Sequence, residues 1–142
     1  INMVSQKKIL ITGDGGVGKT LLVNNRFQGN NISINKSNTT VMLDFPEHGS
    51  ETHNNLSDID VCIVMYDVTR RASYDNVKSW KQKVKKMCGS IPILVVGNKI
   101  DCDERNVVDN STINISVKKQ TNIGALFKEL ERVVYHLEHY EL

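Results

Sequence analysis

The chain has 142 residues, an ordinary composition for a globular protein and a net charge of +2, which gives no indication of a nucleic-acid partner. This length predicts one domain. No apolar run approaches the eighteen or so residues of a membrane span, and the three cysteines show no metal-binding spacing. An odd number of cysteines without a signal peptide is typical of reduced thiols in the cytosol.

The first predicted strand, residues 7–12, ends at a glycine-rich segment. Residues 13–20 read GDGGVGKT and match G-x-x-x-x-G-K-[ST], the pattern of a phosphate-binding loop. A helix over 19–28, ended by Gly29, supplies the second flank that this pattern requires. The glycines let backbone N–H groups converge on an anion beside the positive end of the helix.

Two side chains of this segment have specific predicted tasks. Lys19 supplies positive charge for the β- and γ-phosphates, and Thr20 supplies a hydroxyl ligand for Mg²⁺. The residues predicted to bind the phosphates are Gly13, Asp14, Gly15, Gly16, Val17, Gly18, Lys19, Thr20 and Leu21.

The middle of the chain is predicted to hold three strands and a helix. A weak alternation over 31–35 indicates a strand, residues 36–38 a turn, and 40–45 a strand that stops before Pro46. The apolar run 61–67 is typical of a buried central strand. From residue 73 to residue 87, apolar side chains recur at helical spacing.

A second motif follows a buried strand over 91–97. Residues 98–101 read Asn-Lys-Ile-Asp, an N-K-x-D pattern. The carboxylate of Asp101 can accept both N–H groups on the Watson–Crick edge of guanine, whereas adenine would leave that charge unsatisfied. Asn98 can bond the N7 side of the base and brace the phosphate loop, and the stem of Lys99 can lie over the base.

A short strand over 112–115 leads into Ser116-Val117-Lys118, and an apolar stripe from Ile123 to Leu137 predicts a final helix. Strands that alternate with helices predict an α/β fold with a mostly parallel sheet, helices on both faces, and a ligand at the carboxyl ends of the strands.

With Ser116-Val117-Lys118, residues 7–134 resemble small GTPases of the Ras superfamily. The resemblance implies a three-layer P-loop NTPase fold, and a Ser-Ala-Lys motif in which the backbone N–H of the middle residue, here Val117, contacts the O6 atom of guanine. The stretch 66–80 resembles the Rab and Ran branches, and 88–93 leans toward Ran.

The first departure from this family lies between Lys19 and Asp44, the residue that takes the place of the family's D-x-x-G aspartate. Family members have roughly fifteen more residues here, most of them in switch I, whose threonine completes the Mg²⁺ shell. Thr39 and Thr40 are so near Asp44 that we expect them on a strand. Near Asn31 the family has an aromatic residue that covers the guanine, and this chain has none.

Switch II departs as well, because Asp-Thr-Ala-Gly-Gln aligns with residues 44–48, Asp-Phe-Pro-Glu-His. Glu47 takes the place of the glycine that faces the γ-phosphate, and His48 that of the catalytic glutamine. Shifting the alignment to use Gly49 places Ser50 at the glutamine and loses the aspartate. In both alignments the hydrolytic apparatus is incomplete. A helix that follows the N-K-x-D motif in the family is also largely absent.

The resemblance therefore implies a protein that binds GDP or GTP with Mg²⁺, held by Thr20 and by Asp44 directly or through water, and that hydrolyses GTP slowly. His48 is the one candidate catalytic residue. The alternative is a catalytically silent GDP-binding scaffold for protein partners; a phosphoryl-transferring kinase is disfavoured because the second and third motifs serve guanine. The residues predicted to contact the base are Asn98, Lys99, Asp101, Ser116, Val117 and Lys118.

The expected domain covers 7–138, between an N-terminal tail over 1–6, in which Ile1 and Asn2 precede Met3, and a C-terminal tail over 139–142. The tail lacks the cysteine of a prenylation signal, so we expect no membrane anchor in this sequence. The expected protein is a monomer in the cytoplasm, or in the nucleus if it is Ran-like, and its expected partners are guanine nucleotide and protein regulators or effectors.

Overall fold

The computed structural model describes residues 6–27, 31–34, 37–46 and 56–140. Within these residues, a six-stranded sheet runs through the middle of the fold in the order β2-β3-β1-β4-β5-β6. Five of these strands are parallel, and only the edge strand β2 pairs antiparallel, with β3. The strands are β1 (Gln6–Gly13), β2 (Asn31–Ile34), β3 (Ser37–Leu43), β4 (Val61–Asp67), β5 (Ile93–Asn98) and β6 (Ile113–Asn114).

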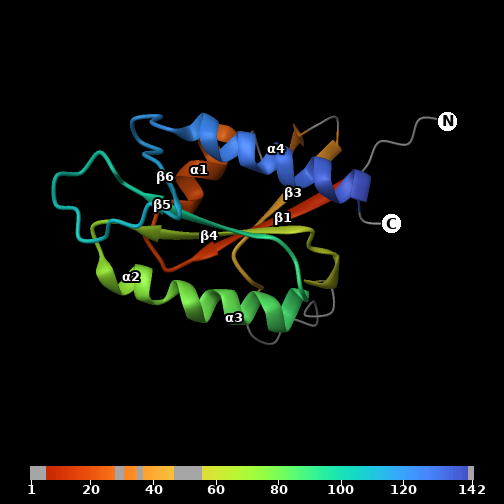
Figure 1. Cartoon of the computed structure of the whole chain (residues 1–142), viewed down its shortest axis with the longest axis horizontal. Helices are drawn as coiled ribbons and strands as arrows, with labels where there is room; N and C mark the ends of the chain where they lie inside the picture. Colours follow the sequence, from red (N-terminus) through yellow and green to blue (C-terminus); the bar gives the residue numbers. More distant parts are fainter. Residues whose placement is uncertain (1–5, 28–30, 35–36, 47–55, 141–142) are drawn as a thin grey trace.

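Helices cover both faces of the sheet, as the sequence predicts (Figure 1). The helices α1 (Lys19–Arg26) and α4 (Ile123–Tyr140) lie on one face, and α2 (Arg71–Asp75) and α3 (Val77–Cys88) lie on the other. The three-layer α/β fold predicted for a P-loop small GTPase is therefore confirmed. Within the described residues, no helix is both long and apolar enough to span a membrane.

Two separate cores result from the alternation of side chains along the strands. Ile9 and Ile11 of β1 belong to the core under α1 and α4, whereas Leu10 belongs to the core under α3. β4 is buried along its whole length and contributes to both. Each fully buried large apolar side chain contributes about 1.5–3 kcal/mol, so both helix layers are held firmly on the sheet.

Several predicted boundaries differ from the structure. The helix expected over 73–87 is divided at Asn76 into α2 and α3. The predicted turn at 36–38 is wrong for its described residues, because Ser37 and Asn38 pair with β2 and begin β3. The strand expected to reach Phe45 ends at Leu43, since Asp44 takes a positive φ of 64°.

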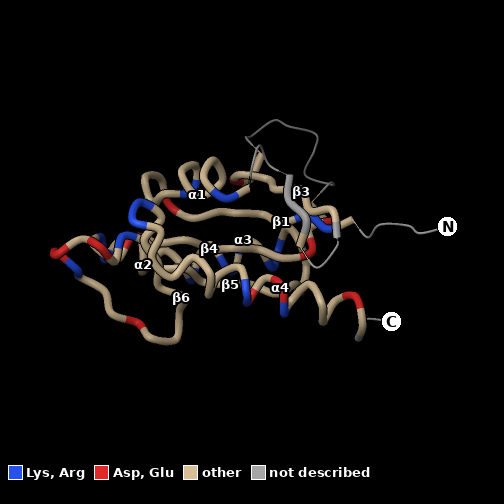
Figure 2. Tube along the Cα trace, turned by 90° about the horizontal axis from the view of Figure 1, so that it is seen from above, with Lys and Arg blue, Asp and Glu red and all other residues tan. Residues whose placement is uncertain are grey.

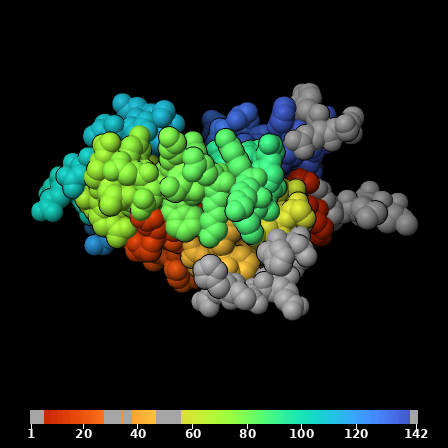
Figure 3. Space-filling view, turned by 90° about the horizontal axis from the view of Figure 1, so that it is seen from below, coloured from red at the N-terminus to blue at the C-terminus, as the bar shows by residue number. Residues whose placement is uncertain are grey.

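The chain between β5 and β6 contains no helix over 99–112, all of it described, which agrees with the predicted trimming. Figure 2 shows this loop extending away from the sheet, with acidic positions along it, and Figure 3 shows it beside the face formed by α2 and α3. A groove of about 730 Å³ opens between α3, β5 and α4. The groove lies where the segment between β5 and β6 supplies no covering helix.

Candidate functional site

The predicted site residues gather at the carboxyl ends of the central parallel strands. The phosphate loop follows β1, the N-K-x-D motif begins at the end of β5, and Ser116-Val117-Lys118 follows β6 (Figure 1). Parallel strands bring these three segments to the same end of the sheet, although the phosphate loop lies about eighty to one hundred residues before the other two in the chain.

The phosphate loop has the backbone conformation of an anion cradle. Gly16 and Gly18 have positive φ values of 76° and 106°, which a residue with a side chain adopts at a cost. A Cβ atom at Gly18 would also stand 2.2 Å from Nδ2 of Asn98. The loop leads directly into α1, whose N-terminus adds partial positive charge at the same place.

Lys19 is buried at the mouth of this loop. Its Nζ atom donates to the carbonyl oxygens of Gly13 and Asp14, at 2.6 and 2.7 Å, and lies 3.3 Å from Oδ1 of Asp44. The only carboxylate facing the ammonium group among the described contacts is thus that of Asp44. A bound phosphate could take over this charge and release Asp44 toward a cation.

Asn98 joins the phosphate site to the base site. Its buried amide donates from Nδ2 to the carbonyl of Val17 at 2.9 Å and accepts at Oδ1 from the N–H of Val117 at 3.1 Å. The predicted bracing of the phosphate loop by Asn98 is present. The predicted contact of the Val117 N–H with O6 of guanine stays a prediction. Because this N–H donates to Asn98, that contact requires the bond to be shared or exchanged.

The carboxylate of Asp101 is oriented by a hydrogen bond from the third motif. The hydroxyl of Ser116 donates to its Oδ1 at 2.7 Å. This hydrogen bond is the main reason why the pKa of Asp101 is lowered, and the charges of Lys118 and Lys119 act in the same direction. An exposed, ionised carboxylate with a fixed orientation suits a base edge that presents two donors.

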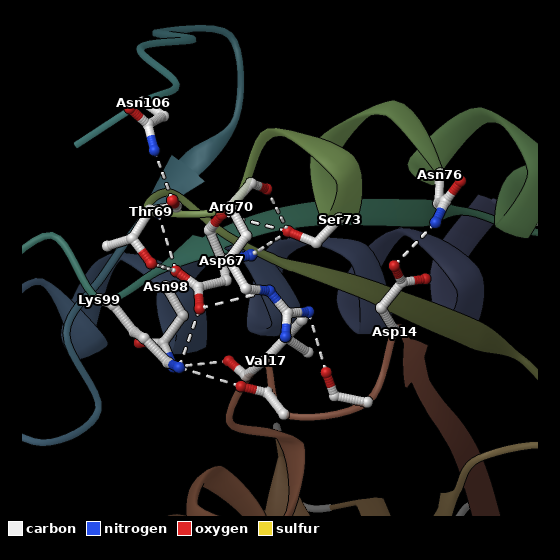
Figure 4. Close-up of polar contacts among 12 residues, drawn as sticks. Asp14, Val17, Asp67, Thr69, Arg70, Ser73, Asn76, Asn98, Lys99 and Asn106 are labelled. Carbon is white, nitrogen blue, oxygen red and sulfur yellow. Dashed lines mark hydrogen bonds and ion pairs between the residues drawn. The ribbon is translucent and has the colours of Figure 1, made fainter. Parts of the chain in front are cut away.

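A buried carboxylate that sequence reasoning did not assign to the site lies behind the loop. Asp67, at the end of β4, accepts from the backbone and hydroxyl of Thr69 at 2.8 and 2.6 Å and lies 2.9 Å from Nζ of Lys99 (Figure 4). Burial acts to raise the pKa of Asp67, but the bonds from Thr69 and Lys99 outweigh it, so the pKa is lowered. One signal was available: a charged residue ends an otherwise apolar central strand.

Asp14 ties the first part of the loop to α3. Its two carboxylate oxygens accept from Nε1 of Trp80 and from Nδ2 of Asn76, both at 2.8 Å. The division between α2 and α3 falls at Asn76, which suits this contact. Trp80 in turn stacks on Phe45, with ring centroids 6.2 Å apart and planes 8° apart, so α3 also holds the chain that follows Asp44.

The predicted Mg²⁺ ligands, Thr20 and Asp44, lie at the start of α1 and just after β3. No group of three His, Cys, Asp or Glu side chains within the described segments could by itself hold a metal ion. Mg²⁺ commonly binds through one or two protein oxygens, waters and substrate phosphates, so this donor set fits the ion only together with a phosphate.

Switch I is as short as predicted, because β2 begins at Asn31 and only residues 27–30 separate it from α1. Thr39 and Thr40 lie on β3, as expected, and Thr39 is buried. Glu47 and the candidate catalytic residue His48 lie outside the described residues, so the role assigned to them stays a prediction.

A comparison with protein-family models finds that the model described as the Ras family matches residues 47–136. The match covers more than half of the chain and includes both predicted guanine motifs. The phosphate loop lies outside the matched range, so its residues and geometry are evidence independent of this match.

Proposed function

Since this chain belongs to the Ras family, we propose that it binds guanine nucleotide together with Mg²⁺, holds GDP in preference to GTP, and hydrolyses GTP slowly. Membership in the family implies guanine-nucleotide binding, and the finer properties are proposals. The observation that supports nucleotide binding most directly is the buried amide of Asn98, whose two hydrogen bonds connect the phosphate loop at Val17 to the base motif at Val117.

The residues present fit a nucleoside diphosphate. The left-handed glycines leave room for an anion against the loop backbone, Lys19 supplies a cation, and Asp101 supplies an acceptor for the base. Mg²⁺ would neutralise phosphate charge when bound. Competition between GDP and ADP tests the assignment: we expect at least about tenfold preference for GDP, the effect of one good hydrogen bond. Equal affinities would exclude a guanine site.

The proposed preference for GDP rests on the protein groups that would contact the γ-phosphate of GTP. In the family, switch I and the glycine of switch II contact that group. Here the chain from α1 to β2 is too short to form switch I, and the sequence has Glu47 in place of the glycine. A carboxylate there would repel the γ-phosphate, whereas a diphosphate would still have the loop and Lys19 as partners.

We expect single-turnover GTP hydrolysis no faster than the intrinsic rate of Ras, on the order of 10⁻⁴ s⁻¹. The sequence has no clear successor to the switch I threonine, and His48 takes the place of the glutamine that orients the attacking water. Phosphate release from preloaded GTP measures this rate in the wild type and in His48→Gln. Rapid hydrolysis by the wild type that slows in His48→Gln would contradict the proposal and identify His48 as a working substitute.

Nucleotide exchange should be fast. Asn31 offers no ring to cover the base, and the short segment over 27–30 cannot close over the ribose. Release of a fluorescent GDP analogue, chased with excess GDP, should be complete within minutes in the presence of Mg²⁺ and faster still with EDTA. A dissociation half-life of many hours with Mg²⁺ would refute this expectation.

Within the family, we propose a place near the Rab and Ran branches. The support is the sequence over 66–80, which resembles those branches. Within this stretch, Trp80 contacts the phosphate loop through its hydrogen bond to Asp14. The partners that this proposal implies are protein regulators or effectors of the kind that Ras-family domains have.

A further inference from the structure

Two cations hold the outer side of the phosphate loop at consecutive peptide groups. Lys99 donates from Nζ to the carbonyl of Gly16 at 3.0 Å, and Arg70 donates from Nη2 to the carbonyl of Gly15 at 2.9 Å (Figure 4). Lys99 belongs to the N-K-x-D motif, but Arg70, at the start of α2, belongs to none of the motifs described above.

Arg70 is held in place by its backbone and by a shared carboxylate. Its N–H donates to the carbonyl of Asp67 at 3.0 Å, and its carbonyl accepts from the hydroxyl of Ser73 at 2.7 Å. The buried Asp67 carboxylate lies between the two cations, 2.9 Å from Nζ of Lys99 and 3.9 Å from Nε of Arg70. One buried negative charge thus orients both donors toward the loop.

Because the peptide groups are planar, the two contacts with outward carbonyls also fix the direction of the N–H groups that follow them. No peptide bond in the described chain is cis, and in a trans peptide the C=O and the following N–H point in opposite directions. Holding the carbonyl of Gly15 outward therefore turns the N–H of Gly16 inward, and holding that of Gly16 does the same for Val17. Successive N–H groups that converge around a left-handed glycine form an anion-binding concavity.

We propose that Arg70 is a positioning residue of the phosphate site, which together with Asp67 and Lys99 sets the N–H of Gly16 toward the phosphates. The guanidinium lies close against the loop, because a Cβ atom at Gly16 would stand 3.4 Å from its Nη1 atom. The inference rests on the proposed function and deepens it. The loop that binds the diphosphate has its backbone conformation fixed by Arg70, Asp67 and Lys99, on the side of the loop away from the phosphates.

Three variants test this inference. Arg70→Met removes every side-chain donor, and Arg70→Lys keeps the charge with a single donor nitrogen. Arg71→Met is the matched control, because Arg71 pairs with Asp75 on the exposed surface. GDP affinity is measured by calorimetry. The position of the Gly16 amide is followed by NMR in the nucleotide-free protein, a readout that does not depend on ligand, and the unfolding free energy is measured alongside.

We expect Arg70→Met to weaken GDP binding about tenfold and to shift the Gly16 amide resonance, with the free energy of unfolding close to that of the control. Arg70→Lys should recover part of both effects, and Arg71→Met should resemble the wild type. Unchanged GDP affinity and an unmoved Gly16 amide resonance in Arg70→Met would overturn the inference. A loss of GDP affinity that is explained entirely by a lower free energy of unfolding would overturn it as well. If the wild type itself fails to bind GDP, the proposed function falls, and the amide shift still decides whether Arg70 sets the loop.

Discussion

Replacement of Lys19 by alanine should weaken GDP binding roughly hundredfold. The ammonium group is the buried cation at the mouth of the phosphate loop, and hydrogen bonds to charged groups contribute about 1.5–3 kcal/mol each, so losing one strong contact and its charge amounts to about two decades in affinity. Arg70 and Lys99 cannot replace it, since both contact the loop's outward carbonyls.

Titration with GDP in the presence of Mg²⁺ measures this effect. Lys8→Ala is the matched control: it makes the same change in β1, where the lysine lies 3.5 Å from Asp58 and far along the strand from the loop. In Lys19→Ala, Asp44 loses its cationic partner, so the nucleotide-free variant should be checked for folding. A folded Lys19→Ala protein that binds GDP as tightly as the wild type would show that the loop does not bind phosphate.

Replacement of Asp101 by asparagine should change which base is preferred. The ionised carboxylate accepts two donors from guanine, whereas an amide presents one donor and one acceptor, which matches the edge of xanthine. We expect GDP affinity to fall between about tenfold and a hundredfold, with a smaller loss or a gain for xanthosine diphosphate. Ser116 should still be able to donate to the remaining side-chain oxygen, so the side chain should keep its orientation.

Competition between GDP and xanthosine diphosphate gives the ratio directly for the wild type and for Asp101→Asn. Asp103→Asn is the control, because Asp103 is an exposed acid two residues further along the same loop. An unchanged ratio in Asp101→Asn would show that this side chain does not contact the Watson–Crick edge of the base. A change of the same size in Asp103→Asn would point to net charge rather than to base recognition.

The sequence by itself determined the features that depend on neighbouring residues. The glycines of residues 13–18 set the loop's backbone conformation locally, and the apolar run 61–67 specified a strand buried on both faces. The sequence also shows that the segment between Lys19 and Asp44 is shorter than in the family. In the structure, α1 ends at Arg26 and β2 begins at Asn31. These are properties of chain length, side-chain size and spacing, which a linear sequence contains in full.

Only the tertiary structure decided which side chains meet across elements. Asp67 lies behind the phosphate loop because β4 pairs with β1, opposite Gly13 at Met65, and with β5, opposite Asn98 at Asp67 itself. That register brings Lys99 and Arg70 to consecutive carbonyls of the loop. It also lets Asn98 engage the N–H of Val117, a donor that the motif alone had assigned to guanine. Such contacts join residues up to about eighty positions apart, so they are set by the register and packing of the sheet and not by local sequence preference.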